Sequence, residues 1–105
     1  MERADFQKVV DSLNQSFKPE RAKGLNAVIQ VEVIGSGDFI LTIQDQKLEF
    51  TSGKAADPRL TLRASSADLE AIFTRKLDPT TAFFQGKLVV QGDMGLAMQL
   101  PGLFS

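Results

Sequence analysis

The spacing of apolar residues changes near residue 25 from a helical period to a strand period, and this change constrains the fold most. Before it, apolar residues recur on one predicted helix face, at Phe6, Val9, Val10, Leu13 and Phe17. After it, every second residue is apolar, so that the apolar side chains share one face of a predicted strand. This alternation is found over residues 27–34, 39–44, 47–51 and 59–63. The first part of the chain is therefore predicted to be a helix followed by an antiparallel meander.

Turn and cap residues divide the rest of the chain. Hairpin turns are predicted at residues 35–38 and 45–46. A serine in the run Ser65-Ser66-Ala67-Asp68, together with Asp78 and Asp93, stands where a helix N-cap is expected, and residues 87–91 form a fifth predicted strand. Pro101 should end or kink the last helix. Because strands and helices are segregated and no linker or repeat is found, residues 1–105 are predicted to form a single α+β domain with one sheet covered on one face by helices.

The segment from Met94 to Phe104 is apolar on nearly every side. Only Gln99 is polar between Met94 and Leu100. An all-round apolar helix should be buried on more than one side. Three roles remain open for it: completing the core, lining a ligand cavity, or forming a dimer contact.

The composition argues against most catalytic chemistry. The chain has no Cys, His or Tyr, which excludes Ser-His and Cys-His nucleophile pairs and zinc sites of the usual kind. Its glycine-rich stretches are better explained as turns than as phosphate-binding loops. The chain is therefore predicted not to be an enzyme and to need no cofactor or metal. A small isomerase or hydrolase with one buried carboxylate is a weaker alternative.

Charge and hydropathy limit which binding partners and which cellular compartment are expected. The formal net charge of −1 disfavours nucleic acid as a partner. No stretch is long enough to span a bilayer, and there is neither a signal peptide nor a C-terminal peroxisomal signal, so a cytoplasmic protein is predicted. A weaker interpretation is transient contact with anionic membranes through Arg75, Lys76 and Lys87, close to the apolar segment.

Residues 78–100 resemble the C-terminal part of the sterol carrier protein type-two (non-specific lipid-transfer) domain. The resemblance rests on the run Ala-Phe-Phe-Gln-Gly-Lys-Leu at residues 82–88, followed by Gly-Asp-Met-Gly-Leu-Ala-Met at residues 92–98. Residues 39–44, 56–57 and 60–62 match more weakly. The resemblance implies a five-stranded, mostly antiparallel sheet covered on one face by about five helices, with an apolar tunnel between them. It also implies binding and transfer of fatty acids, fatty acyl-CoA, sterols and phospholipids.

The sequence departs from the family pattern at three places. Phe39 stands where many members have Trp, and Thr42 stands where Asp is common. Pro101-Gly102 interrupts the last helix early, which suggests that Leu103 and Phe104 plug the tunnel mouth as a lid. These departures bear on the identity of the ligand rather than on the fold.

The residue match and the strand alternation together predict the lipid-binding walls. An acyl chain of about sixteen carbons would have roughly 10 kcal/mol available there before ordering costs. A monomer or weak dimer is expected, and a structural or dimerisation domain accompanying a larger enzyme is the alternative function. The predicted wall residues are Phe39, Leu41, Phe50, Leu69, Ile72, Phe73, Leu77, Phe83, Phe84, Met94, Ala97, Met98, Leu103 and Phe104.

Overall fold

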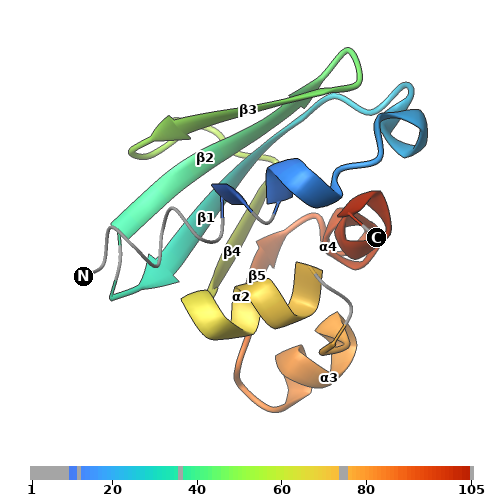
Figure 1. The fold of residues 1–105 in the computed structure, drawn as a ribbon. Helices are drawn as coiled ribbons and strands as arrows, with labels where there is room; N and C mark the ends of the chain where they lie inside the picture. The colour runs from blue at the N-terminus through green and yellow to red at the C-terminus, as the bar shows by residue number, and fades with distance from the viewer. Residues whose placement is uncertain (1–9, 12, 36, 74–75, 105) are drawn as a thin grey trace.

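The computed structural model describes residues 10–11, 13–35, 37–73 and 76–104. Within this part, residues 10–11 and 13–16 are helical, and Leu13 is buried. Phe6 and Val9 of the predicted helix face lie outside the described residues. The α+β class predicted from the sequence is confirmed (Figure 1).

Five strands form one mixed sheet in the order β3-β2-β1-β4-β5 (Figure 1). Their bounds agree with the predicted strands to within two residues. The strands are β1 (Ala27–Ile34), β2 (Gly37–Gln44), β3 (Lys47–Ser52), β4 (Leu60–Ser65) and β5 (Val89–Gly92).

The prediction that the fourth strand continues an antiparallel meander is wrong, because β4 pairs in parallel with β1. The segment between β3 and β4 passes the outer face of the sheet, where the Ala55 amide donates to Gln30 Oε1 at 2.6 Å. The Arg59 amide then donates to the Val28 carbonyl at 2.8 Å. Alternation predicts which face of a strand is buried but not which edge it joins, so the sequence pattern did not reveal this crossover.

Helices pack on one side of the sheet (Figure 1). The described residues contain four α-helical segments rather than about five, together with two short 3₁₀ helices. No helix among them is long and apolar enough to cross a membrane. Besides residues 10–11 and 13–16, the helices are η1 (Pro19–Ala22), α2 (Ser66–Phe73), α3 (Pro79–Phe84), α4 (Met94–Gln99) and η2 (Leu100–Phe104).

The three predicted N-caps are confirmed. The Asp68 amide donates to Ser65 Oγ at 3.1 Å at the start of α2. Asp78 and Asp93 accept in the same way from the third amide of α3 and of α4, each at 3.0 Å. Each side chain satisfies an amide that has no partner within its helix, which fixes where the helix begins.

The inner face of the sheet carries most of the core. Val31 stands between Phe39 of β2 and Leu62 of β4 in the register, and all three are buried. On β3, Leu48 and Phe50 point to the same side and are partly buried against this core. The outer face is largely polar, so the sheet needs helices on one side only.

The C-terminal segment is buried along one side. In α4, Leu96 and Ala97 are buried, whereas Met94 is 41% exposed and Met98 is partly exposed. The expectation that this helix is buried on more than one side is therefore wrong. Leu100, Leu103 and Phe104 are buried within η2, in which the chain continues as a 3₁₀ helix through Pro101.

Candidate functional site

An open groove of about 540 Å³ lies where the end of α2, the start of α3 and the end of α4 meet. Its surface is more polar than apolar, and Asp78 and Gln99 contribute polar side chains beside the apolar ones. The groove is lined by Ile72, Leu77, Asp78, Pro79, Met98, Gln99 and Gly102.

A smaller apolar space that is more enclosed than this groove, and which we call the closed space, lies next to it, and the two share Ile72 and Pro79 in their walls. Its volume is only about 10 Å³, which is at the lower limit for holding one water molecule. The open tunnel implied by the resemblance is therefore not formed by the residues that the structure describes. The space is lined by Leu62, Leu69, Ile72, Phe73, Pro79, Leu88, Ala97 and Leu100.

Local hydrogen bonds position the groove walls. After α2, the amides of Lys76 and Leu77 both donate to the Ala71 carbonyl, at 2.8 and 3.0 Å, so the chain turns tightly there. Across the groove, the Thr80 hydroxyl of α3 donates to Met98 Sδ of α4 at 3.2 Å. A sulfur is a weak acceptor, so this link between the two helices is a weak one.

Six of the predicted wall residues line the groove or the closed space: Leu69, Ile72, Phe73, Leu77, Ala97 and Met98. Five others belong to the core or pack against it without lining either space: Phe39, Leu41, Phe50, Leu103 and Phe104. Phe83, Phe84 and Met94 are exposed. An apolar residue in a strand or helix signals burial, and that signal alone does not distinguish a cavity wall from the core.

Some lining residues had no place in the predicted set. The sequence pattern predicts Leu62 and Leu88 as strand residues and Leu100 as part of the apolar segment, without marking them as wall residues. It predicts Pro79 as the first residue of a helix. The way α3 and α4 pack in the tertiary structure brings these lining residues together. The spacing of residues along the sequence does not predict this packing.

The charged groups of the described residues do not point into the closed space, whose lining is entirely apolar. Asp78 stands at the rim of the groove, where it caps α3. The Leu96 amide and the Arg59 guanidinium lower the pKa of Asp93, which belongs to a helix cap outside the groove. Within the described residues, no cluster of three or more acidic side chains could hold a metal ion.

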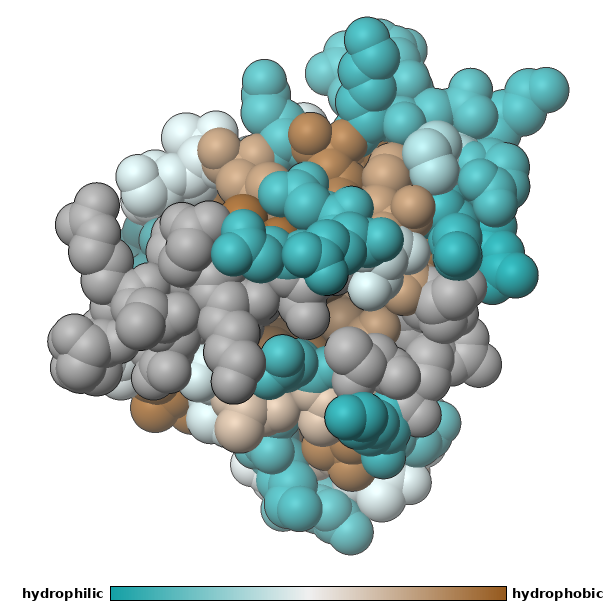
Figure 2. Space-filling model, in the orientation of Figure 1, coloured by the Kyte–Doolittle hydropathy of each residue, from teal (hydrophilic) through white to brown (hydrophobic). Residues whose placement is uncertain are grey.

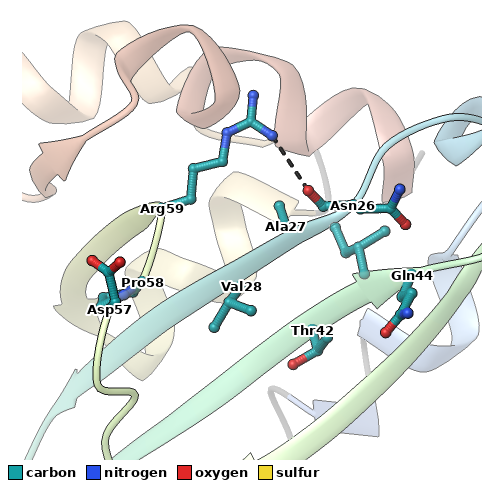
Figure 3. Close-up of a pocket in the computed structure, with 9 residues that line it drawn as sticks. Asn26, Ala27, Val28, Thr42, Gln44, Asp57, Pro58 and Arg59 are labelled. Atoms are coloured by element: carbon teal, nitrogen blue, oxygen red, sulfur yellow. Dashed lines mark hydrogen bonds between the residues drawn. The ribbon is translucent and has the colours of Figure 1, made fainter.

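A second depression, of about 480 Å³, lies beside the strand β1 and the segment before β4 (Figure 3). Arg59 reaches across one end and donates to the Asn26 carbonyl at 3.4 Å. The same side chain forms an ion pair with Asp93 at 3.0 Å. Since these contacts tie the arginine to the fold, the depression is better explained as a surface feature than as an anion site.

The fold thus defines a class of small α+β domains in which helices cover one face of a five-stranded sheet, with a groove where three of the helices meet. The model of the SCP-2 sterol transfer family matches residues 6–105, and the chain belongs to this family. It is 52% identical over 52 residues to sterol carrier protein 2 of Bos taurus, a match that covers 50% of this chain. The match spans only 9% of that relative's length.

Solved structures share the fold. The sec-alkylsulfatase Pisa1 from Pseudomonas superposes with a TM-score of 0.82 at 24% identity, over 89% of this chain and 15% of that enzyme. The palmitated SCP2L2 of Aedes aegypti superposes with a TM-score of 0.59 at 25% identity, over 89% of this chain and 91% of that one. The fold therefore occurs both as nearly a whole chain and as a part of a larger enzyme.

Proposed function

We propose that this chain binds an apolar lipid between its sheet and the helices α2, α3 and α4, and transfers it. The observation that carries the proposal is the junction of an open groove with a wholly apolar closed space through Ile72 and Pro79. Membership of the SCP-2 sterol transfer family supports it and favours binding over a purely structural role.

The closed space must widen to accept a ligand. Met98 lines the adjoining groove, and its unbranched side chain can adopt several shapes at low cost. The exposed side of α4 and the weak Thr80–Met98 link allow α3 and α4 to separate. Each buried methylene would contribute about 0.8 kcal/mol, so a long acyl chain can offset the cost of that separation.

The groove also defines where a polar head group would lie. Asp78 and Gln99 line it, and Lys76 is exposed just before it. We propose a fatty acid with its chain inside and its carboxylate toward Gln99 and Lys76, away from the like charge of Asp78, and the palmitated relative supports that class of ligand. Fatty acyl-CoA, sterols and phospholipids are the further classes we propose, bound without chemical change.

A displacement titration with a naturally fluorescent polyene fatty acid tests this proposal. We expect the wild-type chain to bind the probe and to release it when palmitate is added. Met98→Trp should fill the junction and weaken probe binding by about tenfold or more, because the ligand loses the space for several methylenes. Met94→Trp is the matched control, since Met94 is exposed on the same helix and lines neither space. Absence of probe binding by the folded wild-type chain would refute the proposal.

A further inference from the structure

The end of α3 presents two neighbouring aromatic side chains to solvent. Phe84 is 79% exposed and Phe83 is 37% exposed, and their ring centroids are 5.6 Å apart in an edge-to-face arrangement. Among the described residues, Phe84 is the most exposed of the large hydrophobic side chains. Hydrophobic atoms also reach the surface between hydrophilic ones on the face drawn in Figure 2.

The backbone brings one basic residue to this aromatic pair. The chain reverses at Gly86, whose φ of 75° is accessible to glycine without strain. The Lys87 amide then donates to the Ala82 carbonyl at 2.9 Å, which places Lys87 beside the last turn of α3. We call Phe83, Phe84 and Lys87 the α3 tip.

The segment that carries the α3 tip holds a single charge, and this charge is positive. Between Asp78 and Asp93, Lys87 is the sole charged residue of the sequence. Asp78 caps the opposite end of α3, and Asp93 is paired with Arg59 at 3.0 Å. Exposed aromatic rings next to a lysine, without an acid in the same segment, fit a surface of anionic lipid head groups over apolar chains.

The α3 tip is also close to the proposed lipid entrance. Pro79, at the other end of the same helix, lines the groove. A helix of six residues is about 9 Å long, so a membrane that holds the tip would hold the groove mouth near its surface.

We propose that the α3 tip docks the protein on anionic phospholipid membranes by inserting Phe84 among the acyl chains while Lys87 contacts head groups. This inference goes beyond the binding of a lipid inside the protein. Vesicle binding can be measured without ligand uptake, so either proposal can fail while the other stands.

The absence of Trp from the chain permits a direct test. The variant Phe84→Trp carries a single tryptophan at the tip, and Ile34→Trp carries one at another exposed apolar position, 54% exposed at the end of β1. With vesicles of phosphatidylcholine and phosphatidylserine, we expect the emission of Phe84→Trp to shift to the blue and to be quenched by brominated acyl chains. The emission of Ile34→Trp should stay unchanged.

Co-sedimentation with the same vesicles measures the contribution of each group. Phe84→Ser should weaken binding by about tenfold, and Lys87→Gln by about fivefold at low salt. Ile34→Ser and Lys47→Gln, which lies on the opposite edge strand, are the matched controls and should bind like the wild type. Thermal melts check that each variant is folded.

Three outcomes would overturn the docking proposal. The first is a wild-type chain that does not bind the anionic vesicles. The second is a folded Phe84→Ser variant that binds as well as its control, with no blue shift for Phe84→Trp. The third is a wild-type dimer that Phe84→Ser converts to a monomer without loss of vesicle binding, which would assign the tip to a contact between two copies of this chain.

Discussion

The ring of Phe104 packs edge-on against the ring of Phe73, with centroids 5.0 Å apart and an interplanar angle of 82°. The same Phe104 ring lies 5.6 Å from that of Phe17, so it joins the end of the chain to α2 and to the N-terminal part. The Lys18 amide donates to the Leu103 carbonyl at 2.6 Å, and Arg21 donates to the Gly102 carbonyl at 2.9 Å. These contacts make the last residues part of the core.

Replacing Phe104 with alanine should therefore reduce the free energy of unfolding by about 3–5 kcal/mol, because Phe104 is 1% exposed and its removal leaves a cavity. Urea unfolding followed by circular dichroism measures this loss. Phe84→Ala is the matched control and should change stability by less than about 0.5 kcal/mol, since Phe84 is mostly exposed. Equal losses for the two variants would contradict the placement of Phe104.

This placement changes the expectation for the lid suggested by Pro101-Gly102. Leu103 and Phe104 are buried and line neither the groove nor the closed space. Truncation after Leu100 would remove core side chains and would therefore destabilise the fold. Faster ligand exchange in that variant would not by itself demonstrate a lid.

Gln30 should be essential for holding the segment between β3 and β4. Its buried side-chain amide donates to the Phe39 and Gly53 carbonyls, at 3.2 and 3.0 Å, and accepts from the Ala55 amide. Gln30→Leu should lower the free energy of unfolding by about 2–3 kcal/mol, since it leaves buried polar groups unsatisfied. In Gln30→Leu, hydrogen exchange at the Ala55 amide should be faster than in the wild type, and by more than the loss of global stability alone would produce. Unchanged protection there would contradict the bridging role.

Gly92 should tolerate no side chain. Its φ is 101°, and a Cβ built there would lie 2.6 Å from the Arg59 carbonyl oxygen. Gly92→Ala should destabilise the protein by at least about 1–3 kcal/mol. Gly102→Ala is the control, because a Cβ there meets no atom within 4 Å. Thermal melts compare the two, and equal melting temperatures would contradict the close approach of β5 to Arg59.

Asp93 should make stability depend on pH in the acid range. The Leu96 amide and Arg59 lower the pKa of Asp93 in the folded protein below its ordinary value of 3.8. Its stabilisation is therefore present above pH 3.8 and is lost as the pH falls through the folded pKa. The stability difference between the wild type and Asp93→Asn should shrink as the pH falls below about 4. Asp57→Asn, in the segment before β4, is the control, and a pH-independent difference for Asp93→Asn would contradict this assignment.

Local signals predicted much of the fold because they act through neighbouring residues. Ser65, Asp78 and Asp93 cap helices by contacts within three residues, and alternation assigned the inner face of β1. The parallel pairing of β4 with β1 depends on where the preceding loop crosses the sheet. The alternation of apolar and polar residues along a strand does not indicate this crossing.

The candidate site was predictable only in part, for a related reason. Helical spacing marks the buried face of α2, as at Leu69, whereas Ala97 of the nearly all-apolar α4 is assigned from the residue match to the family. Phe83 and Phe84 are equally apolar yet exposed, since α3 is short and the chain reverses at Gly86. Residue type indicated apolar character, and tertiary packing determined whether each residue faces the core, the groove or solvent.

Native mass spectrometry of the delipidated chain mixed with equimolar palmitate tests the central claim most directly. We predict a one-to-one complex for the wild type and for Met94→Trp, with a strongly reduced complex for Met98→Trp. A folded wild-type chain that forms no complex with palmitate, acyl-CoA, sterol or phospholipid would contradict lipid binding at the junction of groove and apolar space.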